Sequence, residues 1–244
     1  MSYNKNGVVL FEGPSVLDGS PITVIATGLR RTTNTKVGAS MIQVWILRQD
    51  RSPTVAVKDG SDAAICGDCK RRPSQGGDCY VVAFRGPLPV WKSWKAGRYQ
   101  TWDGADTALF TDRIVRFGAY GDPAAVPARV FRPIRKSARG WTSYTHQWRM
   151  PSARHLRAWT MASVDTEAEA TEAQAMGWRT FRARHALEKI LKREITCPAA
   201  KEAPTFGRMT CDACRLCDGV ERGVKRPNVV IVAHGARSPR TKVA

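Results

Sequence analysis

The chain has 244 residues, of which 43% are hydrophobic and 25% are charged, so it is long enough to bury a full core. Its 39 Lys and Arg residues outnumber 21 Asp and Glu residues, and the resulting net charge of +18 attracts polyanions such as nucleic acid. No apolar run approaches the roughly 20 residues that span a bilayer, and residues 1–7 lack the apolar stretch of a secretory signal, which argues against a membrane partner and indicates a cytoplasmic protein.

Strand and helix signals alternate along the first half of the chain. Residues 22–26 and 54–57 predict strands, and the segment between them predicts a helix at about 36–48. Residues 113–117 predict another strand. After it, Asp122 and Pro123 are suited to the N-cap and the first position of a helix.

The clearest unit in the sequence is a β–α–β segment over residues 158–184. It follows a strand expected at residues 141–148. Thr166 and Glu169 form a capping box at the start of its helix, and Gly177 provides the C-terminal stop. Such a unit implies two parallel strands joined by a right-handed crossover.

The last quarter of the chain continues the pattern. The sequence predicts a short helix at residues 185–193, a strand at residues 194–196 and the final strand at residues 228–233. We expect the chain to form a single domain that ends in a basic tail at residues 237–244. Counted together, the strands predict an α/β fold of the TIM-barrel-like (β/α)8 type, either regular or incomplete. An open, doubly wound sheet is the main alternative.

Four cysteines in the last quarter predict a metal centre. Cys211, Cys214 and Cys217 have C-x2-C-x2-C spacing, which is the ligand run of bacterial ferredoxins, and Cys197 is the nearest candidate for the fourth ligand. In a reducing cytosol, clustered thiols are more often metal ligands than disulfides. The run favours a 4Fe–4S cluster over Zn2+, because zinc sites usually use two separate C-x2-C pairs.

A second group, Cys66, Cys69 and Cys79, follows the strand expected at residues 54–57. Three thiolates can hold a 4Fe–4S cluster that has one open iron, or a zinc ion with a histidine as the fourth ligand. The candidate histidines are His146, His155, His185 and His234. Two alternatives stay open: Cys66 and Cys69 can share a zinc ion with downstream cysteines, and Cys79 can be a buried free thiol.

The expected strand map places several of these residues on one functional face. The first cysteine group, His146, Asp165, Cys197 and His234 would all lie at the C-terminal ends of strands, where parallel α/β folds bind ligands. This puts the cysteine-rich loops at the C-terminal face. His146 lies in an aromatic segment, residues 141–149, that suits a pocket wall, and it is the candidate catalytic residue.

Combined motifs resemble an uncharacterised family of bacteriophage and prophage proteins. They are Cys66 to Val81, Phe117 to Pro123, Tyr144 to Trp148, Met161 to Asp165, Gly177 to Phe181 and Cys197 to Gly219. This resemblance implies the cytoplasm of a bacterial host and brings no mechanism. More distantly, the cysteine-rich barrel resembles phage proteins compared with radical S-adenosylmethionine enzymes. The C-x3-C-x2-C motif of those enzymes is absent, although an open iron at Cys66, Cys69 and Cys79 could still bind S-adenosylmethionine.

Two functional hypotheses follow from the sequence. The first is an iron–sulfur protein that acts as an oxidoreductase or an electron carrier with a redox partner, and it includes a radical S-adenosylmethionine-like enzyme. The second is a zinc-stapled protein that binds nucleic acid through its basic surface.

Overall fold

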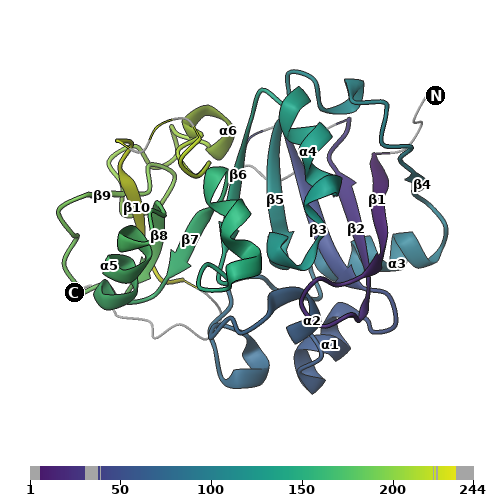
Figure 1. Ribbon diagram of the computed structural model, residues 1–244, viewed down its shortest axis with the longest axis horizontal. Coiled ribbons are helices and arrows are strands. Elements are labelled where there is room, and N and C mark those ends of the chain that lie inside the picture. The colour runs from purple at the N-terminus through teal and green to yellow at the C-terminus, as the bar shows by residue number, and fades with distance from the viewer. Residues whose placement is uncertain (1–5, 31–37, 39, 222, 224, 235–244) are drawn as a thin grey trace.

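The computed structural model describes residues 6–30, 38, 40–221, 223 and 225–234 and shows an α/β fold with one ten-stranded mixed sheet (Figure 1). The strand order is β4-β1-β2-β3-β5-β6-β7-β8-β10-β9. The strands are β1 (Gly7–Pro14), β2 (Pro21–Thr27), β3 (Met41–Arg48), β4 (Gln100–Thr101), β5 (Ile114–Tyr120), β6 (Gly140–Thr145), β7 (Met161–Val164), β8 (Thr180–Arg184), β9 (Glu194–Thr196) and β10 (Asn228–Val232).

The sheet changes character at β3. β1, β2 and β3 are antiparallel neighbours, whereas every neighbouring pair from β3 to β9 is parallel. The strand order runs from β4 at one edge to β9 at the other, so the sheet is open and is not closed into a barrel. The predicted α/β class is confirmed, whereas the TIM-barrel-like (β/α)8 arrangement is not.

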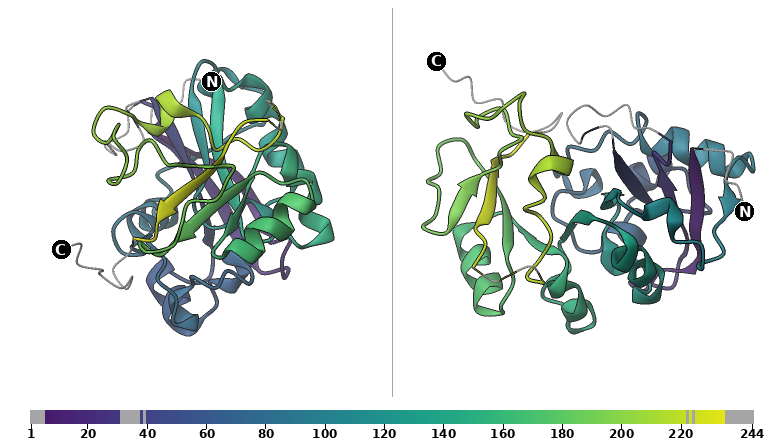
Figure 2. Two further views of the ribbon diagram at one scale, coloured as in Figure 1. Left: turned by 90° about the vertical axis from the view of Figure 1, so that its left-hand side faces the viewer. Right: turned by 90° about the horizontal axis from the view of Figure 1, so that it is seen from above.

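Two of the helices that connect parallel strands, α4 (Ala128–Ser137) and α5 (Glu167–Ala175), lie on one face of the sheet (Figure 1). The helical segments are α1 (Pro53–Asp59), α2 (Ala63–Cys66), α3 (Pro87–Lys95), α4 (Ala128–Ser137), α5 (Glu167–Ala175) and α6 (Cys211–Cys214), with the 3-10 turns η1 (Pro73–Gln75), η2 (Ala108–Phe110), η3 (Pro123–Ala125) and η4 (Pro151–Ala158). In the left view of Figure 2, α4, η4 and α5 lie on one side of the strands and the segment around α6 lies on the other.

The hydrophobic core lies between the sheet and these helices. Its centre contains the rings of Phe117 from β5, Phe131 from α4 and Trp159, whose centroids are 4.9 to 5.9 Å apart. Aromatic rings of this size bury much apolar surface and fix the spacing of helix and sheet. Within the described part of the chain, no helix has the length and apolar character needed to cross a bilayer.

The predicted β7–α5–β8 unit is confirmed. The Thr166 hydroxyl accepts a hydrogen bond from the Glu169 N–H at 3.1 Å, and the Glu169 carboxylate accepts one from the Asp165 N–H at 2.8 Å. Gly177 follows the helix with a φ of +81°, a conformation that favours glycine. The strands predicted around residues 22–26, 113–117, 141–148, 194–196 and 228–233 also form, with β6 ending at Thr145. Asp122 caps a 3-10 turn rather than an α-helix.

Two N-terminal predictions are wrong. The helix expected at about 36–48 is strand β3 from Met41 onward, and residues 36, 37 and 39 lie outside the described residues. A strand that has neighbours on both edges and is covered on both faces reads as a continuous apolar run, which resembles a buried helix in sequence. The strand expected at residues 54–57 is helix α1, which begins at Pro53 and ends at a left-handed Gly60. Strand β1 was not predicted.

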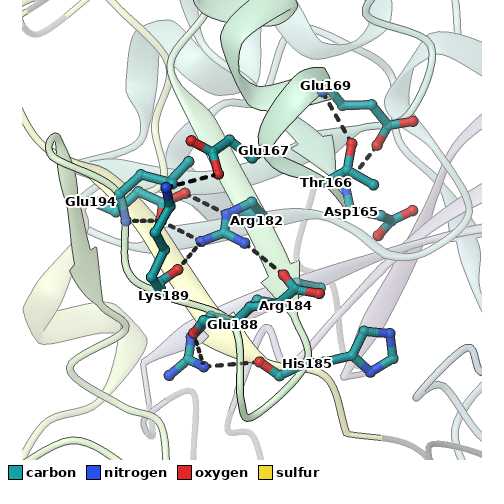
Figure 3. A network of polar contacts seen from close by, with 12 residues as sticks. Asp165, Thr166, Glu167, Glu169, Arg182, Arg184, His185, Glu188, Lys189 and Glu194 are labelled. Atoms are coloured by element: carbon teal, nitrogen blue, oxygen red, sulfur yellow. Dashed lines mark hydrogen bonds and ion pairs between the residues drawn. The ribbon is translucent and has the colours of Figure 1, made fainter.

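The prediction of a short helix at residues 185–193 is also wrong. Arginine side chains donate hydrogen bonds to the backbone carbonyl groups of this segment (Figure 3). Arg184 donates to the carbonyls of His185, Ala186 and Glu188, and Arg182 donates to that of Lys189. The buried Arg182 also pairs with Glu194 at 2.8 Å. These bonds hold the segment as an irregular loop between β8 and β9. The predicted basic tail, residues 237–244, lies outside the described residues.

Candidate functional site

A cavity of about 410 Å³ lies on the face of the parallel strands opposite α4 and α5. Successive side chains of a strand point to opposite faces, so Phe117 enters the core while Arg116 and Gly118 line the cavity. The cavity is also lined by residues from both cysteine groups: Cys66, Cys69, Cys79, Cys197 and Cys211. Two regions that are far apart in the sequence therefore share one cavity.

The first cysteine group lies beyond the C-terminal end of β3 and is held there by two arginines. Cys66 is the last residue of α2, and Cys69 and Cys79 lie in the loop that follows. Arg72 forms a buried ion pair with Asp62 at 2.9 Å and donates to the carbonyls of Gly60 and Gly67.

The second of these arginines ties the same loop to the neighbouring strands. Arg71 binds Asp78 and Asp165, each at 2.7 Å, and donates to the carbonyl of Ala183 in β8. Asp165 directly follows β7, and its predicted position at a strand C-terminus is confirmed. It acts here as a partner of Arg71.

Burial is the main cause of the raised pKa values of the thiols in the first cysteine group. It raises the pKa of Cys69 to about 12, and it also raises the pKa of Cys79 and, strongly, that of Cys66. Cys69 and Cys79 raise the pKa of Cys66 further, because neighbouring thiolates would repel each other. At neutral pH these groups are therefore protonated, and a bound metal would have to displace their protons.

The second cysteine group combines two segments. Cys197 directly follows β9, and its N–H donates to the Val230 carbonyl at 2.8 Å. The other three lie in and after α6. Cys211 packs against Met41 and Ile114, the first residues of β3 and β5, and the Cys217 carbonyl accepts a hydrogen bond from the Ser143 N–H at 2.9 Å.

The first group and the Cys211–Cys214 segment therefore lie at opposite ends of the strands, whereas Cys197 follows the C-terminal end of β9. In Figure 1, α1 and α2 are at the lower end of the sheet and α6 is at the upper end. Asp212 fixes this position because its carboxylate accepts a hydrogen bond from the Ser40 hydroxyl, directly before β3, at 2.9 Å. The prediction that all cysteine-rich loops share the C-terminal face is wrong for Cys211–Cys214, which lie beside the strand N-termini because they precede β10 in the chain.

Part of the predicted ligand set lies together. Cys197 packs against the cluster formed by Met161, Cys217 and Val229, and Cys197 and Cys211 line the same cavity. Burial raises the pKa of Cys217 well above its ordinary value, and a hydrogen bond with Tyr144 lowers it. All seven cysteines lie in the described part of the chain, and none forms a disulfide bond.

A buried arginine holds the loop that follows the cysteine run. Arg179 donates to the carbonyls of Leu216, Gly219 and Pro227 and pairs with Asp218 at 3.1 Å. Its side chain is 3% exposed and that of Asp218 is 0% exposed. Arg179 therefore fixes the backbone on both sides of Cys217 and was not anticipated from the sequence.

Two histidines reach the cavity. His146 directly follows β6, its backbone N–H donates to Asp122 at 2.8 Å, and its Nε2 atom is buried without a partner among the described residues. Burial lowers the pKa of His146, and Asp122 and Asp165 oppose this effect. The ring of His234 lies 5.7 Å from that of Tyr80. His155 and His185 are exposed and do not line the cavity.

No group of three or more His, Cys, Asp and Glu side chains among the described residues is arranged so that it could hold a metal ion. A zinc ion needs its thiolates at about 2.3 Å from one point. As they stand, neither cysteine group nor a mixture of the two meets that requirement.

Sequence reasoning missed the polar residues that the strands carry into the cavity. Arg116 from β5 and Tyr144 from β6 line its wall, and Tyr80 contacts Arg116 from the loop after Cys79. Alternation along β5 could have placed Arg116 opposite Phe117, but only the fold shows that this face encloses a cavity. Comparisons of the chain with family models, with curated proteins and with solved structures found no match.

Proposed function

We propose that the protein binds a 4Fe–4S cluster through Cys197, Cys211, Cys214 and Cys217 and acts as an iron–sulfur redox protein. The observation that supports this proposal is that Cys197, from a separate segment, packs against the cluster that contains the buried Cys217 of the C-x2-C-x2-C run. Clusters of this type are held by four cysteine thiolates, and the C-x2-C-x2-C run supplies three of them.

The donor set suits a cluster better than a single ion. All four donors are sulfur, which iron–sulfur clusters prefer. A cubane is several ångströms wide, so its ligand sulfurs stand farther apart than those around one zinc ion.

The surrounding residues would tune and position such a centre. The cluster would supply one-electron transfer. The hydrogen bond between Tyr144 and the Cys217 sulfur would stabilise the thiolate, and hydrogen bonds to cluster sulfurs are a known control of reduction potential. Arg179 donates hydrogen bonds to the loop that carries Cys217, so this ligand would be held in place by a buried side chain.

The parallel strands support the incomplete form of the predicted barrel. From β3 to β9 the sheet carries helices on one face and the cavity on the other, which is the layering of a barrel wall.

We further propose that Cys66, Cys69 and Cys79, at the C-terminal end of these strands, form a second metal site on the same cavity.

Anaerobic purification of the full chain tests the first proposal. We expect a brown protein that contains several iron atoms per chain and absorbs broadly near ~400 nm, with bleaching by dithionite. Cys214→Ser should remove most of this iron and colour. Ala213→Ser, in the same turn of α6, adds a hydroxyl without removing a thiol and should keep both. A colourless protein with stoichiometric zinc would contradict the proposal.

A further inference from the structure

We propose that the cavity binds a small organic molecule through a carboxylate or phosphate group, and that Arg116 is the residue that holds this anion. The inference goes beyond the proposed cluster and does not depend on it, because it rests on an arginine that the fold leaves without a counter-charge.

Arg116, which is partly buried, differs from the fully buried arginines of the described part of the chain. Arg72, Arg179 and Arg182 each pair with a carboxylate, from Asp62, Asp218 and Glu194 respectively. Among the described residues, by contrast, Arg116 has no carboxylate partner. Its terminal nitrogen contacts the Tyr80 hydroxyl, and its Nε atom is buried without a hydrogen-bond partner. A buried donor atom in this state is costly unless a ligand supplies the missing partner.

The groups around Arg116 are hydroxyls and a thiol rather than carboxylates. The Tyr80 hydroxyl contacts its terminal nitrogen, and Tyr144 and Cys211 line the same cavity. The guanidinium therefore faces the cavity as an uncompensated cation with donors available, and its planar fork suits a carboxylate or phosphate.

The rest of the cavity suits an apolar or planar body. The rings of Tyr144 and Phe181 meet edge to face at 4.7 Å on one wall, and Ala183 and Ile231 continue this wall. Tyr80, 47% exposed, covers the arginine from the opposite loop. A volume of about 410 Å³ lies in the range of small-molecule sites. The ligand class is therefore a compact organic anion with an aromatic or similarly flat body.

Binding of matched probes tests this inference. Benzoate and phenyl phosphate carry the two anion types on the same ring, and benzamide is the neutral control. We expect calorimetric titration of the full chain to show saturable binding of at least one anion, about tenfold or more tighter than benzamide. The stronger of the two anions would identify the preferred group. No saturable binding of either anion at millimolar concentration, or equal affinity for benzamide, would overturn the inference.

Two variants separate a specific site from the general positive charge. Arg116→Gln should lose about tenfold or more of the anion affinity, whereas Arg98→Gln, which removes an exposed charge outside the cavity, should bind like the unaltered chain. Arg116→Lys keeps the charge without the planar fork and should be intermediate. Equal affinity of the Arg116→Gln and Arg98→Gln proteins, with both folded by circular dichroism, would refute the assignment.

Iron content distinguishes this inference from the proposed cluster. Arg116 is not a cluster ligand, so Arg116→Gln should leave iron content unchanged while anion binding falls. Anion binding by a protein without iron would refute the cluster and support the cavity assignment. The rival explanation is that Arg116 only offsets the charge of a cluster at Cys211. In that case Arg116→Gln would shift the reduction potential of an iron-loaded protein that binds neither anion, which would overturn the inference.

Discussion

The Arg179 guanidinium and the Asp218 carboxylate lie 3.1 Å apart, in a region that solvent hardly reaches, one residue after Cys217. Arg226 contacts the other oxygen of the same carboxylate. A single buried acid therefore joins strand β8 to the segment that carries the cysteine run.

Removing Arg179 should destabilise the whole C-terminal part of the sheet. Arg179→Met leaves Asp218 with one cationic partner and three carbonyls without their donor, so we expect the free energy of unfolding to fall by about 3 kcal/mol. Chemical denaturation measures this loss. Arg226→Met, whose side chain is 26% exposed, should cost clearly less, and equal losses would show that Arg179 has no special role.

A second prediction concerns Gly219, in the same loop. Its φ is +75°, and an added Cβ would come within 2.6 Å of backbone atoms of Ala158, Trp159 and Thr160. Gly219→Ala therefore combines conformational strain with a clash against backbone that cannot move aside, and we expect a loss of about 2 kcal/mol or more.

Gly207 provides a matched control for Gly219. It has a similar φ of +79° with nothing within 4 Å of an added Cβ. Gly207→Ala should cost only the strain of the left-handed conformation, about 1 kcal/mol. Thermal denaturation of both variants gives the comparison, and a Gly207→Ala protein as unstable as Gly219→Ala would contradict the steric argument.

A third prediction concerns pH and Glu169. Burial alone would raise the pKa of this carboxyl, but hydrogen bonds from Lys70 and from the Asp165 N–H outweigh it and hold the pKa below its ordinary value. A lowered pKa means that Glu169 stabilises the fold above its unfolded value near ~4.3, and that this contribution disappears as the pH falls through the lower folded value.

The Glu169→Gln variant measures that contribution. We expect it to be less stable than the unaltered chain at neutral pH by up to about 1 kcal/mol, because the exposed Lys70 end of the pair is screened. The difference should vanish in acid. Glu167→Gln removes a carboxylate from the same helical turn but leaves the bonds of Glu169 to Lys70 and Asp165 in place, so it serves as the control variant. A constant Glu169→Gln deficit down to low pH would rule out the ionic explanation.

The separation of the two cysteine groups predicts independent loss of metal. Cys69→Ser should remove metal from the first group and leave the absorption of the proposed cluster intact, because Cys69 lies beyond β3 while the run of Cys211 lies beside the first residues of β3 and β5. Cys214→Ser should do the reverse. Metal analysis of both variants checks this, and loss of all metal from either one would indicate a single shared centre.

Local signals explain the elements that the sequence could predict. Thr166, Glu169 and Gly177 act within one helix, so their hydrogen bonds and backbone conformation follow from neighbouring residues. The cysteine run could likewise be found from spacing alone. Its convergence with Cys197 rests on the β9–β10 pairing, which places Cys197 beside Ile231 and is set by the whole sheet.

The missed features depend on contacts between distant segments. Met41 to Arg48 form a strand only because β2 and β5 flank them. The loop after β8 does not form a helix because Arg182 and Arg184 donate hydrogen bonds to its backbone carbonyl groups. Arg116 is notable for the absence of a carboxylate partner within the described residues, and such an absence becomes visible only when the surrounding chain is in place.

The open sheet ends in its two shortest strands, β4 with two residues and β9 with three. Edge strands this short offer few unpaired backbone N–H and C=O groups with which another polypeptide could form a strand pair. This protects an open sheet from edge-to-edge aggregation. Disrupting β9 would expose the flank of the five-residue strand β10, whose Val229 and Val230 are fully buried. We therefore expect β9 to protect the solubility of the protein as well as to position Cys197.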